Sequence, residues 1–220
     1  LSSFEVAPGR SPSVPWDRRE LALVLEGLAD LARHAVAPGT FAAFADEHAG
    51  VLTQWQAFAD LETAQREALA ARAGALGTWV LSNVDMLAEW ASRAPQATAG
   101  DALVHGDIRA DNILIDGNRA WIVDWPYASV GAPWLDLATF LPSVEMQGGG
   151  SAHAIFAAHP LARDVPHEDL RALVAALAGY FFVQSLQPEV PEIPTLRAFQ
   201  WAQAVPAIRW LRAVEPRVAT

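Results

Sequence analysis

Residues Val104–Ile115 read VHGDIRADNILI, and this stretch decides how the rest of the chain is interpreted. An apolar run at Ala102–Val104 leads into a polar loop, which ends in a second apolar run at Ile113–Ile115. A third run follows at Ala120–Val123, and the sequence DGN between the last two runs is typical of a tight hairpin turn. The pattern therefore predicts short β-strands and an antiparallel hairpin.

The predicted hairpin brings two oxygen-bearing side chains to the same end. Asn112 precedes its first strand and Asp124 follows its second, 12 residues later. Carboxylate and amide oxygens suit Mg²⁺, which takes few protein ligands and completes its shell with water and phosphate. Asp107 lies on the loop five residues before Asn112, within reach of the same point as an acceptor for a hydroxyl proton. A carboxylate base beside such a metal site is an arrangement for phosphoryl transfer.

Helical patterns flank this β segment on both sides. Asp17 offers an N-cap with Glu20 three residues later, which predicts a capping box and a helix to about Arg33. Thr40 is expected to cap a second helix, and helical patterns continue to about Arg93. The chain is therefore expected to be α+β, mostly helical, with a small β insert.

Beyond Arg93, residues 94–100 are expected to form a loop, and the chain after Asp124 is expected to be irregular through Gly131. Helices are predicted at about 134–141, 151–158, 167–186 and 194–213. Pro206 is expected to kink or split the last of them, because proline lacks the amide hydrogen that a helix interior uses.

The composition and net charge of the chain limit the kinds of molecule that it is expected to bind and the chemistry that its side chains can supply. The chain has 220 residues, of which 52% are apolar and 18% charged, so it is long enough and apolar enough to bury a core. Its net charge of −10 argues against nucleic acid or an anionic membrane surface as a partner and permits a cationic small molecule. There is no cysteine, and all 15 basic residues are arginine, so neither thiolate nor lysine chemistry is available on this chain.

Targeting signals are not evident in the sequence. The first residues, LSSFEVAPGR, lack the pattern of a signal peptide. The longest apolar stretch, Ala172–Val183, is about 12 residues, which is too short for a bilayer that needs roughly 20. We expect a soluble cytoplasmic protein.

Three segments together resemble a known family. HGDIRADN at His105–Asn112 is similar to the HGDxxxxN catalytic loop of the aminoglycoside phosphotransferase and choline kinase group, which are relatives of protein kinases. IVDW at Ile122–Trp125 stands where that group carries a metal-binding aspartate. GAPWLDLA at Gly131–Ala138 resembles the segment whose aspartate braces the catalytic loop. The three occur in the family's order and at its separations.

The resemblance implies a role for each matching residue. Asp107 would be the catalytic base that orients the acceptor hydroxyl. Asn112 and Asp124 would hold Mg²⁺ on the phosphates of ATP. His105 would fix the loop, and Asp136 would accept hydrogen bonds from the loop backbone. The competing interpretation is that these are ordinary turn residues, since Asp and Asn favour turns.

The resemblance also implies a fold, the C-terminal lobe of a protein-kinase-like enzyme. Residues 1–16 would be a hinge remnant, with Phe4-Glu5-Val6 similar to the hinge itself, followed by a lead-in. Residues 17–220 would be the lobe, with the catalytic and metal segment at 102–138. We expect the family's N-terminal nucleotide lobe, with its strand lysine, to be absent from this chain, and we therefore expect that lobe to be required and the chain alone to be inactive.

The implied function is that of a small-molecule kinase. It would transfer the γ-phosphoryl group of ATP to a hydroxyl of an aminoglycoside-like or other small substrate, and choline- or amino-acid-type kinases share this chemistry. The alternative is a non-catalytic, kinase-like binding module that lacks the nucleotide lobe. Candidate groups for a cationic substrate are acidic residues that would otherwise form a solvated surface, namely Glu145, Glu168, Asp169, Glu189 and Glu192.

Two further side chains in these segments have open interpretations. Arg109 lies within the catalytic loop, where it either meets a phosphate or forms a salt bridge. Trp125 and Trp134 are expected to pack in the core rather than against a substrate.

Overall fold

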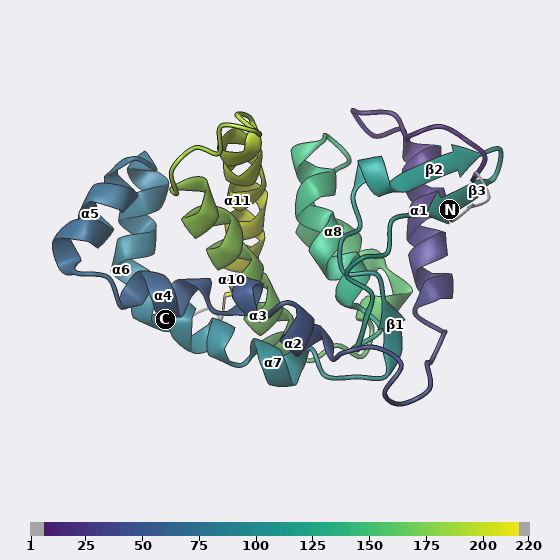
Figure 1. Cartoon of the computed structure of the whole chain (residues 1–220), viewed down its shortest axis with the longest axis horizontal. Helices are drawn as coiled ribbons and strands as arrows, with labels where there is room; N and C mark the ends of the chain where they lie inside the picture. The colour runs from purple at the N-terminus through teal and green to yellow at the C-terminus, as the bar shows by residue number, and fades with distance from the viewer. Residues whose placement is uncertain (1–6, 216–220) are drawn as a thin grey trace. The chain divides into compact units, whose positions relative to one another are not determined.

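The computed structural model describes residues 7–215, so the hinge expected at Phe4, Glu5 and Val6 lies outside the described residues. The chain divides into two compact units. Unit 1 comprises Leu1–Glu47 and Gly100–Asp164, and unit 2 comprises His48–Ala99 and Val165–Thr220. Helices predominate and the β-structure is small, as the sequence predicts (Figure 1).

Unit 1 holds all the strands of the described chain. Its helices are α1 (Arg18–Leu31), α2 (Phe44–Glu47), α8 (Leu135–Met146) and α9 (Ala152–Ala158), with 3₁₀ turns η1 (Ala110–Asn112) and η2 (Pro160–Ala162). Its strands are β1 (Ala102–Val104), β2 (Ile113–Asp116), β3 (Arg119–Ile122) and β4 (Ser129–Gly131). They form two antiparallel pairs, β1 with β4 and β2 with β3.

The predicted hairpin is confirmed. Ile113 pairs with Ile122, and the ladder continues to Asp116 opposite Arg119. The turn between the strands contains Gly117 at φ +59°, a conformation that glycine adopts without a steric penalty. The hairpin lies beside α1 (Figure 1), and its register fixes which residues meet at its open end.

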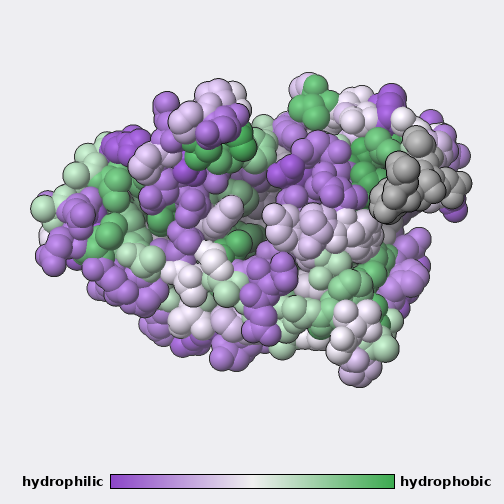
Figure 2. Space-filling model, in the orientation of Figure 1, coloured by the Kyte–Doolittle hydropathy of each residue, from purple (hydrophilic) through white to green (hydrophobic). Residues whose placement is uncertain are grey.

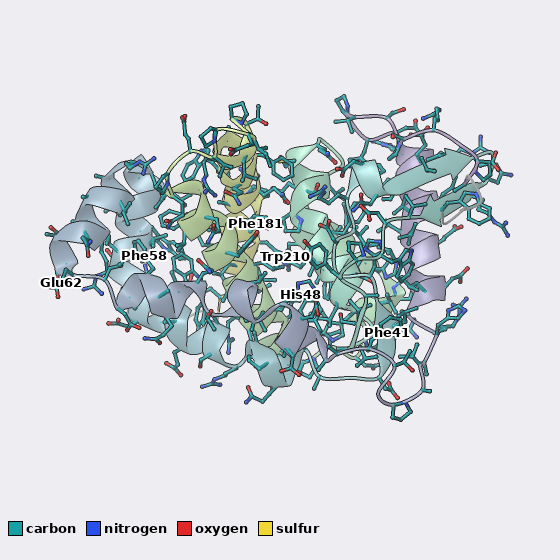
Figure 3. The ribbon with its side chains drawn as sticks, in the orientation of Figure 1. Phe41, His48, Phe58, Glu62, Phe181 and Trp210 are labelled. Carbon is teal, nitrogen blue, oxygen red and sulfur yellow. The ribbon has the colours of Figure 1, made fainter. Side chains whose placement is uncertain are left out.

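Unit 2 consists of helices and the loops that join them, with no strand among its described residues. Its elements are α3 (Ala49–Leu52), α4 (Gln54–Ala59), α5 (Thr63–Ala71), α6 (Gly74–Ser92), α7 (Ala94–Ala97), α10 (His167–Ser185) and α11 (Leu196–Ala213). Trp55 and Phe58 of α4 pack against Phe182 of α10 with ring centroids 5.6 and 5.9 Å from it (Figure 3 labels Phe58). The apolar run of α10 therefore lies in the core of unit 2.

Hydrophilic and hydrophobic residues are interspersed on the visible surface of this unit (Figure 2).

The N-cap of α1 is confirmed but its capping box is not. The carboxylate of Asp17 accepts the backbone N–H groups of Arg19 and Glu20. The carboxylate of Glu20 does not return to Asp17. It accepts instead from the Arg10 guanidinium and from the backbone N–H of Ser13 at 2.7 Å. Glu20 therefore ties the irregular lead-in to the first helix.

Four other expectations were wrong. The Thr40 hydroxyl donates to the Ala37 carbonyl within a turn, and the next helix begins only at Phe44. The expected loop at 94–100 contains helix α7, because Pro95 is tolerated in a first helical turn. The segment before Gly131 forms strand β4, and α11 is not split at Pro206, which is buried within the helix.

Within residues 7–215, no helix combines the length and apolar character needed to cross a membrane.

Candidate active site

His105 is the buried anchor of the loop that follows β1, with none of its surface exposed. Its Nδ1 accepts the backbone N–H of Asp107 at 3.2 Å, and its Nε2 lies 3.0 Å from the carbonyl of Val123. Because a backbone N–H can only donate, Nδ1 must be the unprotonated nitrogen, and Nε2–H donates to Val123. The imidazole therefore joins the loop after β1 to the segment that carries Asp124.

Asp136, in the first turn of α8, supports the same loop from another side. Its two carboxylate oxygens accept the backbone N–H groups of His105 at 2.7 Å and Gly106 at 2.9 Å. Burial raises the pKa of Asp136, and these two hydrogen bonds oppose that shift. Gly106 has φ +83°, so the loop turns sharply where the carboxylate holds it.

Asp107 is half-buried on this loop and oriented by Asn112. The Asn112 amide nitrogen donates to the Asp107 carbonyl at 2.8 Å and to its Oδ2 at 3.3 Å. Burial raises the pKa of Asp107, while the positive charge of Arg109 works in the opposite direction. The result is a carboxylate fixed in orientation, a geometry suited to accepting a proton from a bound hydroxyl.

Asn112 and Asp124 both lie at the open end of the hairpin, where β2 begins and β3 ends. The Asn112 carbonyl accepts the N–H of Val123 at 3.0 Å, which extends the pairing of β2 and β3 by one step toward Asp124. The exposed Asp124 has φ +65°, a left-handed conformation. Since the Asn112 amide nitrogen is bound to Asp107, the amide oxygen is the atom that Asn112 would offer to a metal.

The donor set at this position fits Mg²⁺. It consists of one carboxylate and one amide oxygen, both hard ligands. The described part of the chain contains no cluster of three or more His, Cys, Asp or Glu side chains able to hold a metal. An ion here would therefore take most of its ligands from water and phosphate, as Mg²⁺ commonly does.

Arg109 forms a salt bridge within the loop. Its Nε and Nη2 donate to the two carboxylate oxygens of Asp111 at 3.0 and 2.7 Å, and its Nη1 lies 3.8 Å from Asp107 Oδ1. The sequence left Arg109 open between a phosphate and a salt bridge, and it did not single out Asp111. Side chains two positions apart meet here because the loop is not regular secondary structure.

Trp125 and Trp134 differ in position. Trp134 is 5% exposed, as expected of a core residue. Trp125 is 36% exposed, so the expectation of a core position was wrong for it. Its ring packs edge-on against that of His105, with the centroids 4.6 Å apart.

The acidic candidates for substrate binding occupy several places. Glu145 of α8 accepts the N–H of Ala152 at 2.8 Å and so supports the start of α9. Glu168 and Asp169 lie in the first turn of α10, where burial and then Glu168 raise the pKa of Asp169. Glu189 and Glu192 are exposed between α10 and α11.

Comparisons with known proteins identify the family. The chain is similar in fold to the aminoglycoside phosphotransferase from Alicyclobacillus acidocaldarius subsp. acidocaldarius DSM 446, with a TM-score of 0.53 and 16% identity, covering 96% of this chain and 69% of that one. A choline/ethanolamine kinase family protein from Mesorhizobium loti matches with a TM-score of 0.38 and 16% identity, over 91% of this chain and 80% of that one. No curated protein matches. The model of the phosphotransferase enzyme family matches residues 3–180, so the chain belongs to that family.

Proposed function

We propose that this protein is a small-molecule kinase that transfers the γ-phosphoryl group of ATP to a substrate hydroxyl. The observation that carries the proposal is the arrangement around Asp107. Its carboxylate is oriented by Asn112, on a loop that Asp136 and His105 hold by buried hydrogen bonds. A fixed carboxylate beside a hard-oxygen metal site is what phosphoryl transfer requires, because catalysis there consists mainly of positioning and charge stabilisation.

In the proposed reaction Asp107 Oδ accepts the proton of the acceptor hydroxyl. The acceptor oxygen forms a bond to the γ-phosphorus, the bond between that phosphorus and the β–γ bridging oxygen breaks, and ADP leaves. Asn112 keeps the Asp107 carboxylate directed at the hydroxyl. Asp136 and His105 do not touch substrate and act by fixing the loop.

Asn112 and Asp124 are the residues that would hold Mg²⁺. The ion, when bound, neutralises charge on the phosphate oxygens. Asn112 has a second duty through its amide nitrogen, so its substitution should disturb both metal binding and the orientation of Asp107.

For the acceptor we propose a cationic compound that carries a hydroxyl, such as an aminoglycoside or an amino alcohol. The support is chemical, since the chain carries a net charge of −10 and offers exposed carboxylates at Glu168, Glu189 and Glu192. A similarly folded solved protein carries the name aminoglycoside phosphotransferase.

The experiment is a transfer assay with γ-labelled ATP and Mg²⁺ on the full-length protein. Aminoglycosides, choline and amino alcohols are the test acceptors, and uncharged sugars are the matched controls. We expect labelled product from a cationic acceptor, together with a rise in melting temperature that requires both ATP and Mg²⁺. If neither product nor a nucleotide-dependent thermal shift occurs, the non-catalytic binding module becomes the better account.

A further inference from the structure

Trp125 is anchored firmly for a side chain that is 36% exposed. Its Nε1 donates to the carbonyl of Ile122 at 3.0 Å, and its ring packs against His105. The hydrogen bond spans three positions, so it closes a loop over Val123 and Asp124. Although the side chain is partly exposed, both its N–H group and its ring are therefore held in place by contacts.

Asp124, enclosed by that loop, has an uncommon backbone conformation. Among the described residues it is the one non-glycine residue with positive φ, at +65°. For a residue other than glycine this region costs about 1–2 kcal/mol, and it persists where neighbouring contacts enforce it.

The contacts that enforce it come from both sides of Asp124. Before it, the Val123 N–H donates to the Asn112 carbonyl and the Val123 carbonyl accepts from His105, each at 3.0 Å. After it, the Trp125 indole contacts the Ile122 carbonyl and the His105 ring, and the Trp125 carbonyl accepts the N–H of Ala128 at 3.3 Å. Of these contacts after Asp124, the two that reach back to the segment before it and to His105 are made by the indole.

We infer that Trp125 is a positioning residue that holds Asp124 in its left-handed conformation, with its carboxylate beside Asn112. The inference rests on the proposed function, in which Asp124 and Asn112 supply the metal ligands. Trp125 itself touches neither metal nor substrate. It acts through its N–H group, which closes the loop, and through its ring, which fixes the loop against His105.

The test uses Mn²⁺ as the probe, because its paramagnetism broadens nearby NMR signals even when binding is weak. Trp125→Phe keeps an aromatic ring and removes the N–H group. Trp121→Phe in strand β3 is the matched control, because the Trp121 Nε1 is buried with no hydrogen-bond partner among the described residues. Asp124→Ala serves as the variant without the carboxylate ligand.

In the wild-type protein we expect Mn²⁺ to broaden the signals of Asn112 and its neighbours, and Asp124→Ala to abolish this. For Trp125→Phe we expect about fivefold more Mn²⁺ at half-broadening, the size that corresponds to one lost hydrogen bond. Trp121→Phe should match the wild type. Equal Mn²⁺ dependence in the two Phe variants would overturn the inference and leave the proposed metal site standing.

Two other results separate the inference from the proposal beneath it. Broadening that is absent in the wild type, or unchanged in Asp124→Ala, would overturn the metal site itself and the inference with it. Hydrogen exchange of the Trp125 indole can be measured on the wild-type protein, so this test does not depend on whether a variant folds. The Trp125 indole N–H should exchange with solvent more slowly than a free indole, and exchange at the free rate would overturn its clamping role.

Discussion

The carboxylate of Asp136 accepts the backbone N–H of His105 at 2.7 Å, although the two residues are 31 positions apart. This bond and the second hydrogen bond of Asp136, from the Gly106 N–H, hold the loop after β1 against α8. Buried N–H groups are expensive to leave without a partner, so the fold of unit 1 and the geometry of the candidate site depend on the same side chain.

Asp136→Ala should therefore destabilise the protein. It leaves two N–H donors without their acceptor, each worth about 1–3 kcal/mol, so a loss of about 2–6 kcal/mol is expected in urea denaturation. The control is Asp30→Ala, which breaks an exposed pair with Arg33 and should cost less than about 1 kcal/mol. Equal losses for the two variants would contradict the bracing role.

Asp107→Asn should stabilise the fold at neutral pH while it removes activity. Burial raises the pKa of Asp107, so the folded state binds its proton more tightly than the unfolded state. The wild type is thus favoured at a pH below the ordinary carboxyl value and loses that advantage as pH rises through the raised pKa. Melting curves from pH 3 to 7 should show Asp107→Asn gaining on the wild type as pH increases, and a constant difference would contradict this.

Glu20 should show the opposite pH dependence. Its hydrogen bonds with Arg10 and with the Ser13 N–H lower its pKa. The stabilisation is therefore present above the ordinary carboxyl value and is lost as pH falls through the lowered pKa. Glu20→Gln should be less stable than the wild type at pH 7 and nearly equal in acid. Glu26→Gln, on the exposed side of α1, makes the same change of residue without either hydrogen bond of Glu20 and serves as the control.

Two glycine substitutions should have opposite signs. A Cβ at Gly179 in α10 would lie 2.7 Å from both Cδ1 and Nε1 of Trp55, and the same Nε1 donates to the Ala175 carbonyl. Gly179→Ala should lower the free energy of unfolding by about 1–3 kcal/mol through overpacking.

Gly27 in α1 has open space around it, so Gly27→Ala should raise the free energy of unfolding by about 0.5–1 kcal/mol through helix propensity. Thermal unfolding of the two variants tests both signs.

The local part of the fold was predictable because local chemistry decides it. The DGN turn and the apolar runs beside it set the register of the hairpin, and Asp17 caps α1 without help from distant residues. Strand β4 was missed because its three residues, Ser129–Gly131, are a strand only through pairing with distant β1. The partners of Glu20, Arg10 and the Ser13 N–H, were missed because they lie in the irregular lead-in, where no periodic pattern indicates the backbone conformation.

A split of the last helix at Pro206 was the part of the prediction that proved wrong, because α11 continues through this residue. It is buried in α11 between the small residues Ala204 and Ala207, which are fully buried. The helix continues through it, since tertiary contacts compensate for one absent backbone hydrogen bond.

The sequence indicated which residues form the candidate site, but it did not indicate most of the contacts between their side chains. Spacing alone placed Asn112 near Asp124 and Asp107 on the preceding loop. The bond from Asn112 to Asp107, the Arg109–Asp111 pair and the anchoring of Trp125 depend on irregular backbone. No periodicity encodes such a conformation, and the positive φ of Asp124 is its clearest sign.

The central claim is that Asp107 is the base of a phosphotransferase, and the most direct test compares initial rates of phosphoryl transfer from ATP for the wild type and Asp107→Ala in the full-length protein. Circular dichroism and melting temperature must show that the variant is folded. We predict that turnover falls by about 10²-fold or more, the usual contribution of a positioned proton acceptor. Turnover in a folded Asp107→Ala variant equal to that of the wild type would contradict the assignment.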